Sequence, residues 1–211
     1  MIFYCALEVF QQTLDTGGGE FLLSLHHPGG LTSATEAYPP NVALCREVLT
    51  PLGIDFHEAV GGGPLPFPAQ TFDLILNRHG DYSPHELFRI LRPGGIFLTQ
   101  QVGAENDRDL AALLLDPLPP PPFPEQYLEI ARKKLELAGF SILDAREAFP
   151  PVRFWDIGAL VWFARIIEWE FPGFSVAGCQ RQLFRVQDIL ERKGEILGTT
   201  HRYLLAAMKP L

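Results

Sequence analysis

The chain has 211 residues, of which 47% are hydrophobic and 20% are charged, and its formal net charge is −8. This length and composition predict a globular domain with a sizeable core, and they exclude an intrinsically disordered chain. The negative charge argues against a nucleic-acid partner, because binding of the phosphate backbone needs clustered lysine and arginine.

The spacing of cysteines and histidines indicates whether a metal site or disulfide bonds are expected. Cys5, Cys45 and Cys179 are odd in number and widely spaced, so neither a disulfide framework nor a zinc site is expected. The six histidines offer no trio at metal-binding spacing, so no metal is expected. No apolar run approaches the roughly 20 residues that cross a bilayer, and the first residues lack a basic leader. The sequence predicts a cytoplasmic protein without a membrane partner and leaves its oligomeric state open.

Strands and helices alternate along most of the chain. Short apolar runs predict strands at residues 9–14, 31–36, 54–60, 72–77, 95–102, 140–149 and 201–209. Helical spacing and end signals predict helices at residues 20–27, 39–53, 85–91, 127–140 and 181–194. Ser83 and Glu86 form a capping box before the third helix, with the Glu86 side chain reaching back. The alternation predicts an α/β, Rossmann-like doubly wound fold with a mostly parallel seven-stranded sheet.

Two segments interrupt this alternation. Residues 116–126, DPLPPPPFPEQ, predict an extended polyproline connection, and residues 151–198 predict an aromatic-rich helical insert. The core of the single expected domain, 1–211, is then assigned to residues 13–115, 126–150 and 200–211. The aromatic residues grouped in the insert are Phe154, Trp155, Trp162, Phe163, Trp169 and Phe171. Their rings either form a lid that presents surfaces to a substrate or pack the insert onto the sheet.

The stretch LDTGGGE, residues 14–20, joins the first predicted strand to the first predicted helix. Ligands of open α/β sheets bind at this edge, beyond the carboxyl ends of the strands. Glycines there permit positive φ and a close approach of ligand to backbone, although a plain turn also explains them. Glu36 ends the second strand, 21 residues after Asp15, where a carboxylate can accept hydrogen bonds from the ribose of a nucleoside.

The glycine pattern also limits the kind of nucleoside. A dinucleotide site needs G-x-G-x-x-G, and the third glycine of that pattern would fall at Leu22. Asp15 is unfavourable beside a pyrophosphate and suits a ligand with a positive charge and an ammonium group.

At this point the chain resembles a known family. The segment DTGGG, residues 15–19, looks like the D-x-G-x-G signature of class I S-adenosylmethionine-dependent methyltransferases. Glu36 matches their ribose-binding acid, and LPFPAQTFDLILNRH, residues 65–79, matches their fourth-strand segment. ILRPGGIFLTQQV, residues 90–102, resembles their turn into the fifth strand. The resemblance covers roughly residues 13–115 and is strongest to the small methyltransferases of the general type 11 group.

The resemblance implies S-adenosylmethionine as cofactor. The residues that it implies for cofactor binding are Asp15, Thr16, Gly17, Gly18, Gly19, Glu36, Ala37, Asn77 and Arg78. Asp15 and the glycine backbone would bracket the methionine part, and Asn77 and Arg78 would lie near its end. Phe21 stands in place of the third glycine of the longer signature. The family usually has an adenine-binding acid after the third strand, and residues 61–63, all glycine, occupy that region here, so backbone groups and apolar packing are expected to recognise adenine.

Methyl transfer from a sulfonium is an in-line displacement in which the cofactor supplies the activation, so no catalytic residue is obligatory. His79 is the candidate base for an acceptor that must lose a proton; alternatively, local hydrogen bonds satisfy it. Tyr82, Gln101 and Trp155 are further candidates for substrate contact.

The predicted function is S-adenosylmethionine-dependent methyl transfer to a small molecule. An alternative is an inactive methyltransferase-like module with a binding or regulatory role, which the short N-terminal segment and the missing adenine acid motivate. A third hypothesis is a nicotinamide-dependent oxidoreductase.

Overall fold

The structure is a computed structural model that describes residues 11–14, 17–59 and 62–211. The chain divides into two compact units. Unit 1 comprises Met1–Gln101, Glu129–Arg146 and Leu204–Leu211, and unit 2 comprises Val102–Leu128 and Glu147–Tyr203. Unit 2 therefore contains the expected insert together with residues 102–128, part of which the sequence assigns to the core.

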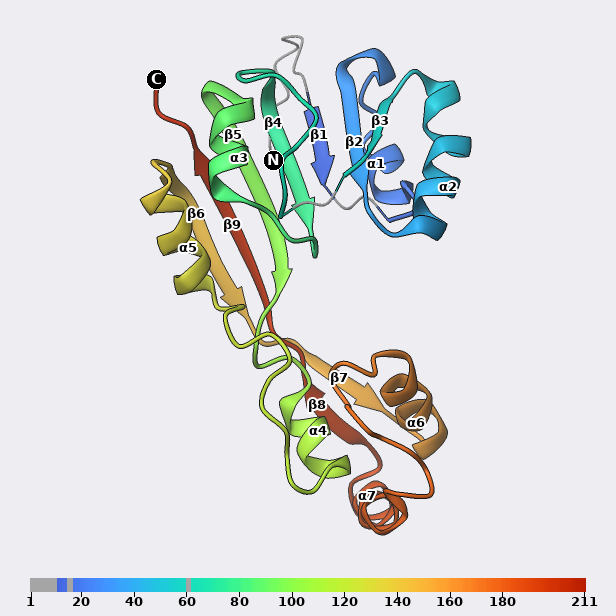
Figure 1. Ribbon diagram of the computed structural model, residues 1–211. Helices are drawn as coiled ribbons and strands as arrows, with labels where there is room; N and C mark the ends of the chain where they lie inside the picture. Colours follow the sequence, from blue (N-terminus) through green and yellow to red (C-terminus); the bar gives the residue numbers. More distant parts are fainter. Residues whose placement is uncertain (1–10, 15–16, 60–61) are drawn as a thin grey trace. The chain divides into compact units, whose positions relative to one another are not determined.

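A seven-stranded sheet forms the centre of unit 1 (Figure 1). Its strands, in spatial order, are β3 (Asp55–Glu58), β2 (Thr32–Glu36), β1 (Gln11–Leu14), β4 (Phe72–Arg78), β5 (Leu91–Val102), β9 (Arg202–Met208) and β6 (Ser141–Ala148). The pairs β3–β2, β2–β1, β1–β4 and β4–β5 are parallel. In Figure 1 the arrow of β9 runs opposite to those of β5 and β6, so the sheet is mixed. The α/β Rossmann-like class expected from the sequence is therefore confirmed.

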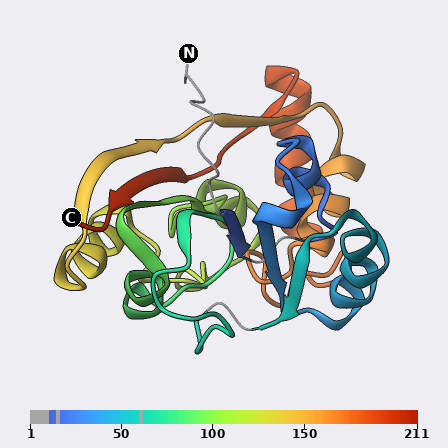
Figure 2. The ribbon, with the colours of Figure 1, turned by 90° about the horizontal axis from the view of Figure 1, so that it is seen from above.

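The helices of unit 1 lie between these strands in the chain. They are α1 (Glu20–Ser24), α2 (Pro39–Val48), α3 (Pro84–Ile90) and α5 (Leu128–Leu137), with 3₁₀ turns at Gly29–Leu31 and Thr50–Leu52. Helix α2 packs against β2 and β3, as the view from above in Figure 2 also shows. The predicted helix 39–53 divides into α2 and a 3₁₀ turn, which Gly53 ends with a φ of 77°. Proline at the first helical position suits both α2 and α3, because the missing N–H has no partner there in any helix.

One prediction about α3 is half wrong. Ser83 does cap the helix, since its hydroxyl accepts a bond from the Glu86 N–H. The Glu86 carboxylate does not reach back to Ser83, because it accepts bonds from the Leu65 N–H at 2.9 Å and from the Arg89 guanidinium at 2.7 and 2.9 Å. A cation and a loop N–H compete successfully for this carboxylate, and its pKa is lowered mainly by the bond to Arg89.

Unit 2 has its own core, which mixes short strands and helices. Its elements are α4 (Arg108–Leu114), β7 (Pro151–Phe154), α6 (Ile157–Ile166), α7 (Gln180–Lys193) and β8 (Ile196–Thr199). Strands β7 and β8 pair in antiparallel fashion, from Pro151 opposite Thr199 to Phe154 opposite Ile196. The core between the helices contains Leu110, Leu114, Phe154, Leu160, Ala164, Phe171, Leu183, Val186 and Ile196.

The aromatic residues of the insert separate into two groups. Phe154 and Phe171 are 7% and 1% exposed, and Phe163 packs against both, with ring centroids 5.2 and 6.2 Å apart. The tryptophans are more than half exposed: Trp155 71%, Trp162 66% and Trp169 51%. The phenylalanines therefore pack inside the core of unit 2, and the tryptophans are more than half exposed. Packing of the insert onto the seven-stranded sheet and the formation of a lid both stay predictions.

Candidate functional site

The glycine loop precedes α1, and its glycines are required for different reasons. Gly17 has a φ of 64°, and no atom of the described residues lies within 4 Å of the position that a Cβ would take, so this side is open to them. Gly19 has a φ of 90°, and a Cβ there would come within 2.9 Å of the Leu49 side chain, a core residue. At Gly18 the three atoms nearest to a Cβ would all belong to the flexible Glu20 side chain. Gly19 thus serves packing, whereas Gly17 leaves backbone accessible to a ligand.

Glu36 connects the end of β2 to this loop. Its side chain is 5% exposed, and Oε2 accepts a bond from the Gly17 N–H at 2.8 Å. Oε1 accepts from the N–H groups of Ala37 and Tyr38 at 2.8 and 2.9 Å. Asn41 Nδ2 donates to Oε2 over a longer 3.4 Å. Because a carboxylate oxygen accepts about two bonds, Oε2 keeps one position that is only weakly occupied.

Cys45 also bonds to the glycine loop. The thiol is fully buried on α2 and donates to the Gly17 carbonyl at 3.1 Å. Burial, followed by the charges of Glu36 and Glu20, raises the pKa of this thiol to about 11, so it stays protonated at neutral pH. The sequence offered no sign of this contact, because Cys45 lies on a helix 28 residues away in the chain.

A buried polar network lies where β4 and β5 end. Asn77 Oδ1 accepts bonds from Thr99 Oγ1 at 2.8 Å and from Gln101 Nε2 at 2.5 Å. Gln101 Nε2 also donates to the Gly80 carbonyl at 3.0 Å, which fixes the orientation of its amide and, through it, that of Asn77. Asn77 is 3% exposed, and within the described part of the chain its Nδ2 has no hydrogen-bond partner. A buried donor without an acceptor lowers the stability of the folded state, and an acceptor on a bound ligand would remove this penalty.

The other residues expected near this edge lie on β4 or directly after it. The Arg78 guanidinium lies over the Phe21 ring, with Cζ 5.4 Å from the ring centroid, so Phe21 is a cation–π partner at the start of α1. His79 has a φ of 66°, and its N–H donates to the Gln100 carbonyl at 2.9 Å. The Tyr82 ring packs edge-on against Phe97, with centroids 4.9 Å apart.

Unit 1 thus brings together Gly17 and Glu36 on one side, and Asn77, Arg78 and Gln101 on the other. Asp15 and Thr16 lie outside the described residues, so their proposed contacts stay predictions. Trp155 belongs to unit 2, and its part in substrate binding also stays a prediction. Among the residues that the structure describes, no group of three or more histidine, cysteine, aspartate or glutamate side chains could hold a metal ion.

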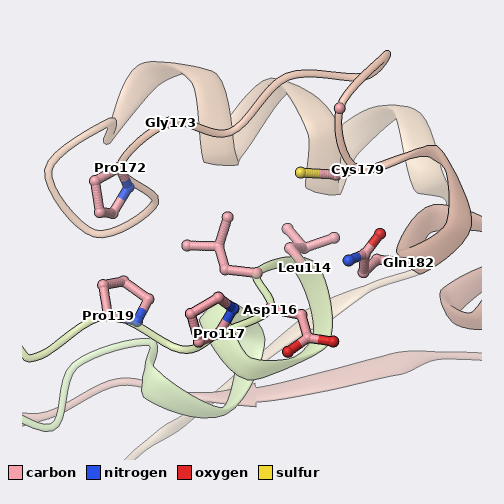
Figure 3. Close-up of a pocket in the computed structure, with 10 residues that line it drawn as sticks. Leu114, Asp116, Pro117, Pro119, Pro172, Gly173, Cys179 and Gln182 are labelled. Carbon is pink, nitrogen blue, oxygen red and sulfur yellow. The ribbon is translucent and has the colours of Figure 1, made fainter.

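Unit 2 has a hollow of about 270 Å³ between α4, the proline-rich segment and the start of α7 (Figure 3). Pro117, Pro119 and Pro172 line one part, and Asp116 and Gln182 supply polar groups. The lining has no histidine and no paired carboxylates, so it does not assemble a catalytic set.

Both ring nitrogens of a buried histidine in unit 2 have hydrogen-bond partners. His201 is 0% exposed, its Nδ1 accepts from the Glu105 N–H at 3.1 Å, and its Nε2 lies 2.9 Å from Glu147 Oε1. Because a backbone N–H donates to Nδ1, the ring proton is on Nε2 and is donated to the carboxylate. Phe149 stacks on the ring, with centroids 4.5 Å apart. This histidine supports the packing of unit 2.

No helix in the part of the chain that the structure describes is long and apolar enough to cross a membrane.

Comparison with known proteins shows similarity at the level of structure. No protein-family model matches the chain, and no curated protein matches it in sequence. A candidate methyltransferase from Bacillus halodurans is 15% identical, with a TM-score of 0.64 over 95% of this chain and 92% of that one. The YcgJ protein of Bacillus subtilis is 16% identical, with a TM-score of 0.64 over 98% and 94%.

A third solved structure contains ligands. Phosphoethanolamine N-methyltransferase 2 of Haemonchus contortus, in complex with phosphomonomethylethanolamine and S-adenosylhomocysteine, is 14% identical, with a TM-score of 0.53. The match covers 95% of this chain and 48% of that one. At these identities the likeness is one of fold, and the chain has the fold of the class I S-adenosylmethionine-dependent methyltransferases.

Proposed function

We propose that this protein transfers a methyl group from S-adenosylmethionine to a small-molecule acceptor. The observation that carries the proposal is the buried Glu36 carboxylate, which is bonded to the N–H of Gly17, beside backbone that no side chain of the described residues covers. A carboxylate at the end of the second strand and an open glycine backbone are the two features that a nucleoside needs at the carboxyl edge of a parallel sheet. The methyltransferase fold makes S-adenosylmethionine the nucleoside to test first.

The described residues fit the chemical groups of this cofactor. Glu36 Oε2 has a weakly occupied acceptor position, in which a ribose hydroxyl can replace the 3.4 Å bond from Asn41. The unpaired Asn77 Nδ2 is a donor suited to the methionine carboxylate, and the Arg78 guanidinium adds a second. Asp15 and Thr16 are proposed, from the resemblance alone, to complete the methionine side.

The bound cofactor supplies a methyl group that is already activated on its sulfonium. The residues of the protein then have mainly to orient the acceptor and to exclude water. Gln101 is proposed as a positioning residue rather than a substrate contact, because its amide is already bonded to Asn77 and Gly80. His79, held at the end of β4 by its bond to Gln100, is the proposed base for acceptors that must lose a proton. Tyr82 and Trp155 remain proposed substrate contacts.

A small-molecule acceptor agrees with the charge of the chain. A net charge of −8 opposes the close approach of a nucleic acid. The open glycine backbone and the Asn77 donor are suited to a ligand whether or not the protein is active. Turnover, and not binding, therefore separates the proposed enzyme from the alternative of an inactive binding module.

Calorimetric titration with S-adenosylhomocysteine tests the cofactor site with the product form, which cannot react. We expect micromolar binding by the wild-type protein and binding weaker by about tenfold or more in Gly17→Ala, because the new methyl group fills the open side of the loop. Gly194→Ala is the matched control: Gly194 has a φ of 77°, also with nothing within 4 Å, but it ends α7 in unit 2. Both variants introduce the same backbone strain of roughly 1–2 kcal/mol.

If the folded wild-type protein does not bind S-adenosylhomocysteine, the proposed function is wrong. If it binds, release of S-adenosylhomocysteine from S-adenosylmethionine in the presence of amines, carboxylates and phenols then identifies the acceptor class. Saturable binding of NADH in place of S-adenosylhomocysteine would favour the oxidoreductase hypothesis.

A further inference from the structure

The segment that follows β3 starts beside the proposed ribose site. The Ala59 N–H donates to the Glu36 carbonyl at 3.1 Å, directly after β3 ends. Gly62 is three residues further on, so it lies within about 10 Å of Ala59 along the chain. A base attached to a ribose at Glu36 can therefore reach this segment.

An acidic side chain from another part of the sequence reaches Gly62. A Cβ at Gly62 would lie 2.5 Å from Asp81 Oδ2 and 3.3 Å from Asp81 Cγ. Asp81 follows β4 and is four residues beyond Asn77, so it comes from the same edge of the sheet. Gly62 does not have a positive φ, so the close approach of this carboxylate, rather than the backbone conformation, excludes a side chain there.

The Asp81 carboxylate is oriented, and one of its oxygens keeps its acceptor capacity. Oδ1 accepts from the Tyr82 N–H at 2.9 Å, and the Tyr82 ring packs against the buried Phe97. Within residues 11–14, 17–59 and 62–211, no donor is bonded to Oδ2. The remaining acceptor therefore lies beside Gly62 on an exposed residue, where it can meet a donor on a ligand.

We propose that Asp81 accepts a hydrogen bond from the exocyclic 6-amino group of the adenine ring, and so selects a 6-aminopurine nucleoside over its 6-oxo analogue. This inference rests on the proposed function, because it places the ribose at Glu36. A carboxylate cannot donate to a 6-oxo group, and the two oxygens would repel each other, so the discrimination has a direct electrostatic cause. The acid that the sequence lacks after β3 is then supplied by the loop after β4.

The test compares S-adenosylhomocysteine with S-inosylhomocysteine, which differs at the 6-position of the purine. We expect the wild-type protein to bind the amino form at least about tenfold more tightly. Asp81→Ala should weaken binding of the amino form and leave that of the oxo form nearly unchanged, so that the ratio falls towards one. Asp81→Asn should bind the oxo form more tightly than the wild-type protein does, because its amide can donate to the oxo group.

Two further variants separate the inference from general effects. Gly62→Ala keeps the Asp81 side chain but pushes its carboxylate aside, so it should also lower the ratio. Asp55→Ala removes the same charge at the other end of β3, where the carboxylate faces His57 at 3.0 Å, and should leave the ratio unchanged.

Failure of the inference and failure of the proposed function give different results. If the wild-type protein binds S-adenosylhomocysteine but Asp81→Ala keeps the full ratio, the Asp81 assignment is overturned and the proposed function stands. If the wild-type protein binds neither nucleoside, both are overturned.

Discussion

Single residues in this protein often serve a purpose that their type does not reveal. Glu36 was expected to face a ribose, and it also fixes the glycine loop through the Gly17 N–H and closes the turn after β2 through Ala37 and Tyr38. The same carboxylate therefore supports the backbone that it is proposed to complement. Removal of its charge would disturb the loop and the ligand contact together, which is why Gly17 is the cleaner position for a binding test.

Asp107 is a buried acid whose ionisation lowers the stability of the folded state. It is 1% exposed and has a φ of 54°. Its Oδ1 has no hydrogen-bond partner among the described residues, while Oδ2 accepts from Asn106 Nδ2 at 2.7 Å. The Asn106 amide also donates to Glu170, a second buried carboxylate, at 3.1 Å. Burial, followed by the charge of Glu170, raises the pKa of Asp107 to about 6 from the ordinary 3.8. Burial is also the main cause of the raised pKa of Glu170.

This shift predicts how stability depends on pH. The folded state holds the Asp107 proton more tightly than the unfolded state, so the associated stability is complete below about pH 4 and is lost as the pH rises through about 6. We expect Asp107→Asn to raise the free energy of unfolding at pH 7.5 by about 1–3 kcal/mol and to change it little at about pH 3.5, below both pKa values. Urea denaturation at both pH values measures this difference.

The exposed Asp188 on α7 offers the control, since Asp188→Asn removes one negative charge without burial and should have the same small effect at both pH values. An Asp107→Asn variant that is no more stable than the wild-type protein at pH 7.5 would contradict the assignment.

At the scale of elements, helix ends illustrate what local sequence can and cannot specify. The sequence signalled the cap of α3, at Ser83, but the bond from the Glu86 N–H to Ser83 Oγ is long, at 3.5 Å. The cap of α6 was not recognised, yet Asp156 Oδ1 accepts from the Ala159 N–H at 2.7 Å. The quality of a cap depends on where tertiary packing holds the preceding chain, and the motif contains no information on this distance.

These distances predict unequal effects for two matched substitutions. Asp156→Ala should lower the free energy of unfolding by about 1 kcal/mol, whereas Ser83→Ala should lower it by only about 0.5 kcal/mol, because the bond that it removes is already weak. Urea denaturation followed by circular dichroism compares the two variants directly. A larger loss for Ser83→Ala than for Asp156→Ala would show that the Ser83 hydroxyl has a further role.

At the scale of the whole molecule, the chain builds two compact units with separate cores, and it passes between them at the end of β5, the start of α5, the end of β6 and the start of β9. The core of unit 1 beneath the glycine loop contains Leu22, Ala34, Cys45, Leu49 and Ile54. The core of unit 2 contains leucines of α4 and α7 together with Phe154 and Phe171. The proposed cofactor contacts all lie in unit 1, apart from those in residues that the structure does not describe.

This division predicts where a bound ligand slows amide hydrogen exchange. Saturating S-adenosylhomocysteine should protect the glycine loop from Gly17 onwards, the turn after β2 and the end of β4. Exchange in the core of α4 and α7 should stay unchanged, because neither helix belongs to unit 1. Mass spectrometry of deuterated peptides, with adenosine as a weaker control ligand, measures both regions. Strong protection of α4 and α7 would show that unit 2 takes part in cofactor binding.

The sequence by itself determined the features that have a short-range physical cause. Apolar runs of strand length alternate with helical segments, and this alternation favours parallel strands joined by crossover helices, so the order of elements from β1 to β5 was predictable. Proline at helix starts and glycine at helix ends set the bounds of α2 and α3 within a few residues. The glycine run and the spacing to Glu36 located the proposed site for the same reason, since both follow from the edge at which parallel strands end.

Only the tertiary structure decided which residues that are distant in the sequence contact one another at the site. The thiol of Cys45 bonded to Gly17, the amide of Asn77 bonded to Gln101 and the carboxylate of Asp81 beside Gly62 join segments that lie 19 to 28 residues apart in the chain. Strands β7 and β8 have four residues each and pair across more than 40 residues, so no local pattern identifies them. Such contacts depend on packing and on the competition of donors for a given acceptor, and neither is encoded in the spacing of residues along the chain.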